Sequence, residues 1–325
     1  MTIHLAAFVL ATTMMVVSAE RAERVVEQEE AVRLETATGV IHGTLLMPGN
    51  APGKVAVALI IAGSGPTDRN GNSPALPGPN NSLKLLAEAL AAQGIATLRY
   101  DKRSIAASMG AARTESELRF TQFSDDAAAW IAQLRNDGRF STISVIGHSE
   151  GSLLGIMAAQ KERADAFVSI AGAGRPAADA LAQQLESNWP AESKTEALRM
   201  LNELRAGRTI EQVPPGLMML FRPSVQPYMM SWLPLDPAEQ LKKLDMPVLI
   251  VQGTTDVQIG VNDAERLAQA YPKGKLALLD GMNHVLKEVR EASQQTASYS
   301  NPNLDLHPEL GKQIGAFVLG VKAGR

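Results

Sequence analysis

The sequence predicts an α/β protein in which helices cover both faces of a mostly parallel sheet. Continuous apolar runs of strand length, of which residues 55–63 (VAVALIIAG) are the clearest, are typical of strands buried on both faces. Between these runs apolar residues recur at helical intervals, and strand–helix alternation indicates a parallel sheet. The chain has 325 residues, of which 45% are hydrophobic, so it can form one large core or a core and a lobe.

The elements are expected in the following order. Residues 30–47 alternate polar and apolar side chains around Thr38 and Gly39, which predicts an antiparallel hairpin. A long Gly/Pro/Asn-rich loop follows the first buried strand, and the next helix has Asn81 or Ser82 as its N-cap and Gly94 at its end. The remaining strands are predicted at 95–101, 142–147, 166–172, 247–253 and 275–280, and the remaining helices at 124–137, 149–160, 262–270 and 308–320.

Residues 175–245 break this alternation because they contain no clear apolar strand. Residues 177–188 and 192–207 have the spacing of amphipathic helices, and 214–237 are rich in Met, Pro and aromatic residues. We expect 175–245 to form a helical cap over the C-terminal edge of the sheet, inserted into a core made of 20–174 and 246–325. The side chains expected to face an apolar cavity under this cap are Met218, Met219, Tyr228, Met229, Met230 and Trp232. The alternative is that they only attach the cap to the core.

The first residues have the pattern of an export signal. Residues 5–17 are an uncharged apolar run, too short for the roughly 20 residues that span a bilayer, and small residues precede a cut after Ala19. The segment before the run has no Lys or Arg, which is atypical. We therefore expect 1–19 to be a signal peptide and the protein to be periplasmic or secreted, with a buried or frayed N-terminal helix in a cytoplasmic protein as the alternative. The N-terminal mass of the native protein distinguishes the two.

Composition excludes several classes of function. The net charge is −3, which gives no reason to expect nucleic acid or an anionic membrane surface as a partner, and no stable membrane anchor is expected. The chain has no cysteine, so disulfides, thiolate catalysis, cysteine-ligated zinc and iron–sulfur clusters are excluded. The oligomeric state is left open by the sequence.

Residues 145–152 (VIGHSEGS) place Ser149 between Gly147 and Gly151, where a buried strand turns directly into a helix. Such a turn strains the backbone of its middle residue, and a side chain at either flank would collide with the neighbouring strand or helix. The hydroxyl is thereby exposed at the C-terminal edge of the sheet, where open parallel sheets bind ligands. The alternative is a chance Gly-x-Ser-x-Gly, and its position between strand and helix argues against that.

A serine hydroxyl is a weak nucleophile unless a base takes its proton and a carboxylate orients that base. His284 lies in a loop after a predicted strand and is the expected base. Asp256, just past the preceding strand, is the expected carboxylate, with Asp280 as the runner-up, whereas Asp263 suits the N-terminus of a helix. The other histidines occupy less suitable places: His4 in the leader, His42 in the hairpin, His148 beside the serine and His307 before the last helix.

The order Ser149, Asp256, His284, together with five short motifs, resembles the α/β-hydrolase superfamily and, within it, a bacterial serine esterase (carboxylesterase) group. The motifs are GSGPTDRNGN, YDKR, GHSEGS, QGTTDVQI and GMNHVLK, and the likeness covers roughly residues 30–320. The resemblance implies the α/β-hydrolase fold. The group would have glycines after YDKR, where this chain has residues 104–108 (SIAAS), so the shape of that loop is not carried over.

The resemblance also implies where an oxyanion would be held. One donor is the backbone N–H of Glu150, after the nucleophile, and the other is expected from Ser64 in the loop at 63–65. Gly65 and Arg69 border the same region and, with Tyr228, Met229 and Trp232, are candidates for substrate binding. Asp101 and Arg103 are expected to be structural partners.

The predicted function is hydrolysis of short to medium acyl or small aromatic esters through an acyl-enzyme, with a small-molecule ester as the partner and no metal or organic cofactor. An aminopeptidase or amidase on the same fold is the first alternative, and it would need inward-pointing acidic residues such as Glu186 or Glu211. A thioesterase or lactonase is also open. A non-catalytic binding module would lack at least one element of the site.

Overall fold

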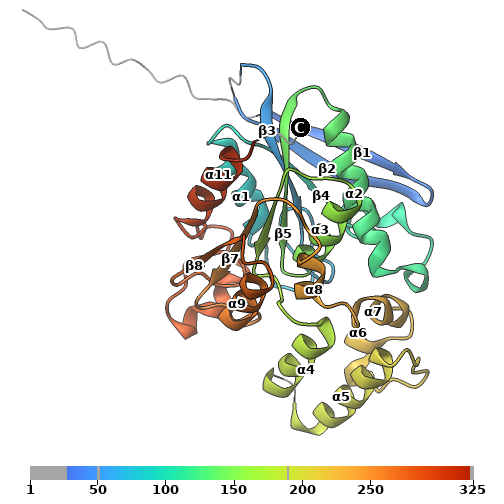
Figure 1. The fold of residues 1–325 in the computed structure, drawn as a ribbon. Coiled ribbons are helices and arrows are strands. Elements are labelled where there is room, and N and C mark those ends of the chain that lie inside the picture. The colour runs from blue at the N-terminus through green and yellow to red at the C-terminus, as the bar shows by residue number, and fades with distance from the viewer. Residues whose placement is uncertain (1–27, 50–51, 189, 323–325) are drawn as a thin grey trace, which may run out of the picture.

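An eight-stranded sheet forms the centre of the protein (Figure 1). The computed structural model describes residues 28–49, 52–188 and 190–322, so the predicted leader at 1–19 lies outside the described residues. Within these ranges no helix is long and apolar enough to cross a membrane. The strands are β1 (Gln28–Thr36), β2 (Gly39–Met47), β3 (Val55–Ile61), β4 (Ala96–Tyr100), β5 (Phe140–His148), β6 (Ala166–Ile170), β7 (Val248–Gly253) and β8 (Lys275–Leu279).

The strand order is β1-β2-β4-β3-β5-β6-β7-β8. The predicted hairpin is confirmed, since β1 and β2 pair antiparallel with Thr36 opposite Gly39. β2 is also antiparallel to β4, and every pairing from β4 to β8 is parallel. The predicted α/β class and the mostly parallel sheet are therefore confirmed.

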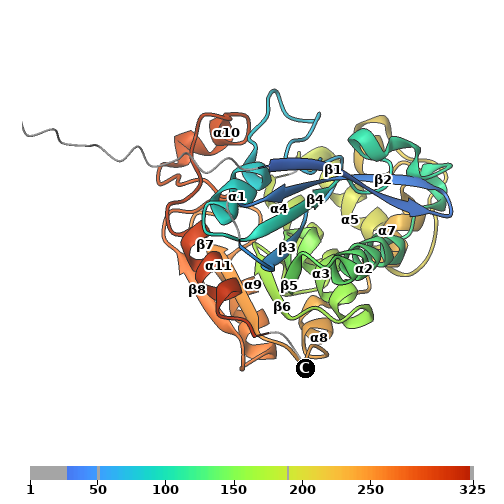
Figure 2. The same cartoon turned by 90° about the horizontal axis from the view of Figure 1, so that it is seen from above.

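Helices cover both faces of the sheet (Figure 2). On one face, α1 (Ser82–Ala91) and α11 (Leu310–Leu319) bury apolar residues against the strands. On the other face lie α2 (Phe120–Asn136), α3 (Glu150–Lys161) and α9 (Val261–Ala270). Side chains of β3 alternate between these two cores, as the period of a strand requires.

The segment between β6 and β7 is helical. Its elements are α4 (Ala177–Asn188), α5 (Ala191–Arg205), η3 (Pro215–Leu217), α6 (Met218–Phe221), α7 (Gln226–Trp232) and α8 (Pro237–Leu241). Helices α4 to α7 share an apolar cluster of their own, whereas α8 joins the core of the sheet beside α3 and α9. In Figure 1, α4 to α7 form a lobe beyond the end of the sheet at which β5 meets α3. The domain boundaries at 174 and 246 stay predictions.

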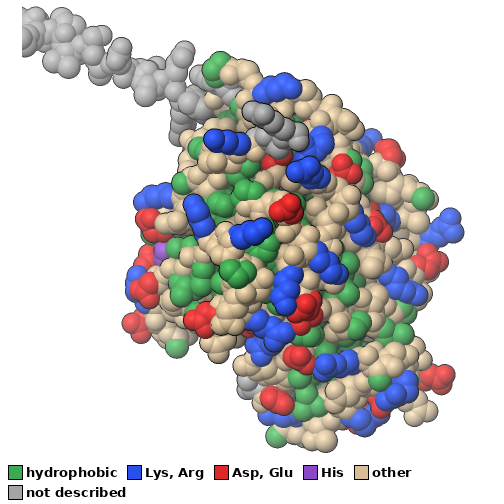
Figure 3. Space-filling view, in the orientation of Figure 1, with side chains coloured by type: hydrophobic (Ala, Val, Ile, Leu, Met, Phe, Trp, Pro, Cys, Tyr) green, Lys and Arg blue, Asp and Glu red, His purple; other side chains and the backbone are tan. Residues whose placement is uncertain are grey.

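Some short elements have no counterpart among the predictions. The loop after β4 contains the 3₁₀ turns η1 (Ala106–Ala111) and η2 (Glu115–Glu117). The C-terminal region contains η4 (Ala292–Gln294) and α10 (Gln295–Ser298). On the face shown in Figure 3, basic and acidic side chains are interspersed rather than gathered into one patch of a single sign.

Candidate active site

Ser149 occupies the sharp turn between β5 and α3. Its backbone angles, φ 54° and ψ −122°, lie in a region that non-glycine residues rarely adopt. A Cβ on Gly147 would come within 2.2 Å of the Gly151 carbonyl oxygen, and a Cβ on Gly151 would come within 2.3 Å of the Ile61 carbonyl oxygen of β3. The steric reason predicted for the two glycines is confirmed, and the turn leaves the Ser149 side chain lining a cavity.

His284 and Asp256 meet through a hydrogen bond of 2.8 Å between Nδ1 and Oδ2. Their side chains are 7% and 1% exposed. The second carboxylate oxygen of Asp256, Oδ1, accepts backbone N–H groups of Gln258 at 2.8 Å and Ile259 at 3.0 Å. Asp280, the runner-up, pairs instead with Arg290 on the surface.

Burial alone would raise the pKa of Asp256. The charge and hydrogen bond of His284, with the N–H groups of Ile259 and Gln258, outweigh that effect and hold the pKa below its ordinary value. Asp256 is therefore ionised at neutral pH, and its acceptor oxygen fixes His284 with a proton on Nδ1. The other ring nitrogen, Nε2, is then free to accept a proton.

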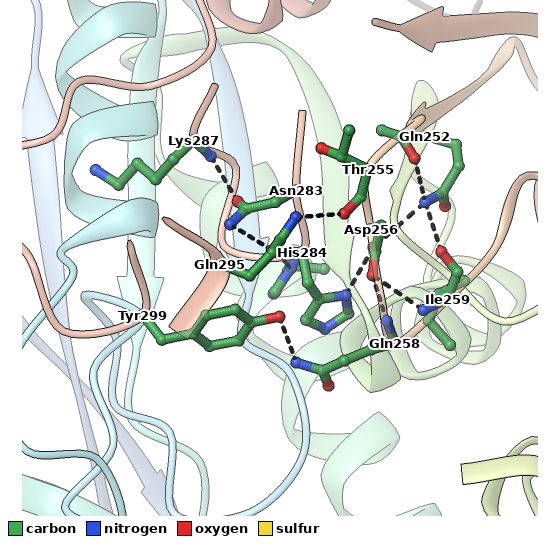
Figure 4. A network of polar contacts seen from close by, with 12 residues as sticks. Gln252, Thr255, Asp256, Gln258, Ile259, Asn283, His284, Lys287, Gln295 and Tyr299 are labelled. Carbon is green, nitrogen blue, oxygen red and sulfur yellow. Dashed lines mark hydrogen bonds and ion pairs between the residues drawn. The ribbon is translucent and has the colours of Figure 1, made fainter. Parts of the chain in front are cut away.

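Polar contacts behind His284 fix its loop (Figure 4). The Asn283 amide donates to Ser298 Oγ at 2.7 Å, and its Oδ1 accepts the backbone N–H of Lys287 at 3.0 Å. Lys287 is buried and its ammonium binds the Leu304 carbonyl; burial lowers its pKa to about 8. A chain of loop contacts thus fixes the direction of the imidazole.

His148, the residue before Ser149, connects the turn at Ser149 to the loop of His284. The imidazole of His148 bonds through Nε2 to the His284 carbonyl oxygen at 2.9 Å, and the two rings are 5.0 Å apart. Among the described residues the Ser149 hydroxyl has no hydrogen-bond partner, so the third contact, from Ser149 to His284, is not made in this structure. Catalytic hydrogen bonds are often long without substrate and shorten when it binds.

The two residues whose N–H groups are predicted to hold an oxyanion line the same cavity. Glu150 is the first residue of α3, so its N–H has no partner within the helix. Ser64 follows β3, and in the described part of the chain its N–H donates to no protein acceptor. Both residues line the cavity beside Ser149. The site therefore presents a hydroxyl, two free N–H donors and a nearby carboxylate-oriented imidazole.

The cavity lies between the sheet edge and the helical lobe, and its volume is about 80 Å³. Its apolar wall includes Leu153 of α3, Leu181 of α4 and Trp232 of α7. Arg175 and Gln184 add polar groups, and Arg175 is held by Asp263 at 2.9 Å.

Comparison with known proteins agrees with this geometry. The model of the family described as "Serine aminopeptidase, S33" matches residues 81–213, less than half of the chain. Esterase EstD of Thermotoga maritima is 27% identical over 267 residues, which cover 80% of this chain. The chain spans 61% of the length of that curated relative.

Solved structures share the fold. Est1E from Butyrivibrio proteoclasticus, determined with ferulic acid bound, superposes with a TM-score of 0.57 at 17% identity and covers 89% of this chain and 96% of its own. A bromoperoxidase from Bacillus anthracis superposes with a TM-score of 0.54 at 14% identity and covers 89% of this chain and 100% of its own. The chain has the α/β-hydrolase fold. At such low identity the likeness concerns the fold, and the reaction has to be argued from the site.

The residues expected to bind substrate lie in different places, and only some of them line the cavity. Trp232 lines the cavity, as does Ser64, whereas Gly65, Arg69, Tyr228 and Met229 are not among its lining residues. Met229 is buried in the core of the lobe. Met218 and Met219, expected to face an apolar cavity, are instead 42% and 78% exposed, and that expectation is wrong for them.

Arg69 binds within the fold. Its guanidinium pairs with Asp101 at 2.7 Å and donates to Thr44 Oγ1 at 3.0 Å. Asp101 also accepts the Arg69 backbone N–H at 2.8 Å. Arg103 pairs with Asp126 of α2 at 2.5 Å rather than with Asp101. Asp101 and Arg103 of YDKR therefore stabilise different parts of the protein.

Sequence reasoning missed three polar residues around the site. Gln252 of β7 donates to Asp256 Oδ2 at 3.3 Å and to the Ile259 carbonyl at 2.8 Å. Gln258 lines the cavity and donates to Tyr299 Oη at 3.0 Å. Lys102 contacts the loop of Ser64 from behind. Gln252 and Gln258 could have been identified from their place in the motif QGTTDVQI, and Lys102 from its place in YDKR.

His148 makes the stability of the protein depend on pH. Burial, and next the charge of His284, lower its pKa from 6.5 to about 3. Below pH 6.5 the His148 imidazole is protonated in the unfolded chain but stays neutral in the folded chain. The free energy of unfolding therefore falls by about 1.4 kcal/mol per pH unit from pH 6.5 towards pH 3. We expect wild type to lose about 2 kcal/mol more than His148→Gln between pH 7 and pH 5 in urea unfolding. Equal losses in the two proteins would contradict this assignment.

Proposed function

We propose that this α/β-hydrolase is a serine esterase that cleaves carboxylic esters of short acyl chains. The observation that carries the proposal is the strained turn at Ser149 on a cavity with two unpaired N–H groups, linked through His148 to the loop of the His284–Asp256 pair. This arrangement supplies a nucleophile, a base, an orienting carboxylate and an oxyanion site. EstD is named an esterase, and Est1E was determined with ferulic acid bound. Both facts support the class of serine esterases.

The mechanism is double displacement. His284 takes the proton of Ser149 as the hydroxyl oxygen attacks the ester carbonyl, and the N–H groups of Ser64 and Glu150 stabilise the negative oxygen. The imidazolium then protonates the alcohol, which leaves an acyl-enzyme. Water attacks the acyl group by the same route, with His284 as base, and the acid is released while Ser149 regains its proton. Asp256 stays ionised throughout and stabilises the imidazolium.

The cavity favours esters over peptides with a free amino terminus. An aminopeptidase needs a carboxylate that faces the substrate amine. Glu186 is exposed, and Glu211 lines a different depression on the lobe. Of the described residues that line the cavity, Glu150 alone is acidic, and its carboxylate is already paired with Lys102. The site therefore has no free anion to bind an ammonium group.

Cavity size predicts the acyl preference. A cavity of about 80 Å³ is small beside the roughly 300–1,000 Å³ of pockets that take drug-sized ligands. We expect kcat/KM on p-nitrophenyl esters to be highest for acetate to butyrate and to fall by about tenfold or more at octanoate. An aminoacyl p-nitroanilide and a thioester of the same acyl group serve as comparisons. Faster cleavage of the aminoacyl anilide than of the butyrate ester would contradict the esterase proposal.

We also propose that residues 1–19 direct export, on the strength of their apolar run and small residues before the cut. Native protein from a periplasmic fraction should then begin at Glu20. A full-length N-terminus there would contradict the proposal.

A further inference from the structure

A buried ion pair lies directly behind the two oxyanion donors, and the mechanism above does not use it. Lys102, just after β4, pairs with the Glu150 carboxylate at 3.0 Å, and each side chain is 3% exposed. The same ammonium donates to the carbonyl oxygen of Gly63. It also lies 6.0 Å from the centre of the Phe123 ring. One cation thus touches both segments that carry the oxyanion donors.

The contact with Gly63 acts on the N–H of Ser64. The carbonyl of Gly63 and the N–H of Ser64 belong to one planar peptide, so fixing the oxygen also fixes the direction of the N–H. A positive charge on the carbonyl oxygen polarises the peptide and makes its N–H a stronger donor. Gly63 itself is tightly placed, because a Cβ there would lie 3.2 Å from the Ser149 Cβ.

The contact with Glu150 is needed for electrostatic reasons. Glu150 carries a carboxylate on the residue whose backbone N–H would hold the oxyanion. An unpaired buried carboxylate so close to a developing negative oxygen would repel it strongly, because the interior screens charge weakly. Lys102 neutralises that carboxylate and holds it away from solvent.

The helical lobe reaches this pair through Tyr228 of α7. Burial, and next the charge and hydrogen bond of Glu150, hold the pKa of the Tyr228 phenol well above its ordinary value. The ring packs against Phe120 and Phe123 of α2 at 5.9 Å and 5.3 Å between ring centres. Because the Lys102 ammonium also lies over the Phe123 ring, Tyr228, expected to bind substrate, reaches the ion pair from the lobe through Phe123.

We propose that Lys102 is a positioning residue that orients both oxyanion donors, through the Gly63 carbonyl and the Glu150 carboxylate, and that Tyr228 links the lobe to this network. The inference rests on the proposed esterase mechanism. It assigns to the Lys of YDKR and the Glu of GHSEGS a joint role in stabilising the transition state. Lys102 touches no substrate and acts only through its two partners.

The first test is Lys102→Met. Loss of one oxyanion donor costs about 10²–10³ in kcat, so misdirecting the Ser64 N–H and freeing the Glu150 charge should lower kcat about 100-fold with KM changed less than about threefold. A fluorophosphonate probe, whose phosphoryl oxygen occupies the oxyanion site, should label Ser149 more slowly by a similar factor. In that step the serine oxygen bonds phosphorus, fluoride leaves, and His284 takes the proton.

A double variant separates positioning from folding. Lys102→Met with Glu150→Gln leaves no lone buried charge, so Tm should recover towards wild type, while kcat and the labelling rate stay about tenfold low because the Gly63 anchor is absent. Tyr228→Phe should lower kcat about threefold to tenfold. The matched control is Arg103→Met with Asp126→Asn, a neighbouring buried pair that should lower Tm with kcat within about threefold of wild type.

The results divide cleanly. If the double variant recovers wild-type kcat and labelling rate together with Tm, the pair is only structural and the proposal is overturned. An unchanged Tyr228→Phe enzyme overturns the link to the lobe. If wild type is labelled at Ser149 but hydrolyses no ester, the proposed substrate class fails, whereas the labelling rates still decide the role of Lys102.

Discussion

Ser149→Ala should lower ester hydrolysis by about 10⁴–10⁶ in kcat and abolish labelling by a fluorophosphonate probe. The reason is that the reaction needs the Ser149 oxygen as its nucleophile. The other described serine with a positive φ, Ser104 at 62°, lies in the loop after β4 and not between a strand and a helix. Folding should be retained, since the hydroxyl has no hydrogen-bond partner in the described chain and alanine keeps the same Cβ. Progress curves with p-nitrophenyl butyrate and intact-mass labelling measure the two effects.

Ser141→Ala is the matched control. Ser141 lies at the other end of β5 and is exposed, so its loss should leave activity and labelling unchanged. Equal rates for wild type and Ser149→Ala would make the esterase assignment wrong. They would favour a non-catalytic module on a hydrolase scaffold, the remote alternative.

Strand positions could be predicted from the sequence because parallel strands buried on both faces must be continuously apolar. β3 is such a run and β7 begins with four apolar residues in succession, and both strands lie where they were expected. Helix α2 began earlier than predicted. The predicted helix started at residue 124, but the Gln122 side chain accepts the Arg119 N–H at 2.8 Å and the helix starts at Phe120. Phe120 and Phe123 are buried, and this tertiary packing stabilises the first turn of α2, which helix propensity alone does not predict.

Side-chain direction in the lobe could not be predicted. In residues 214–237 apolar side chains are so frequent that the pattern does not separate a cavity wall from the lobe's own core. Met229 packs inside the lobe, Met219 points to solvent and Trp232 lines the cavity. Whether a side chain is buried, exposed or lines the cavity depends on how the short helices of the lobe pack against one another, and this tertiary packing is not encoded in the local pattern.

The reactive residues of the site could be predicted because they lie just after the ends of strands. Ser149, Asp256 and His284 each follow a recognisable strand. The structure pairs Asp256 with His284, and His148, the neighbour of Ser149, bonds to the His284 carbonyl oxygen. The network of Lys102 was not visible because its partners, Gly63 and Glu150, are far away in the chain. Only the shared sheet edge brings the three segments together.

His284→Ala should lower kcat by about 10⁴–10⁶ with folding retained, whereas Asp256→Asn should lower it by about 10⁴. Activity falls because no group takes the Ser149 proton without the imidazole. Folding is retained because Asp256 still accepts hydrogen bonds from the N–H groups of Gln258 and Ile259. Asn at 256 can present N–H to Nδ1, which favours the wrong tautomer and leaves Nε2 unable to accept a proton. Both variants should keep the wild-type circular dichroism spectrum.

Asp280→Asn is the control that separates the two candidate carboxylates. Asp280 is exposed and pairs with Arg290, so its loss should change kcat less than about twofold. If Asp280→Asn were inactive and Asp256→Asn active, the pairing at 2.8 Å would not be the one that orients the base. The expected order of activities is instead wild type, Asp280→Asn, Asp256→Asn and His284→Ala, because losing the base costs more than losing the group that orients it.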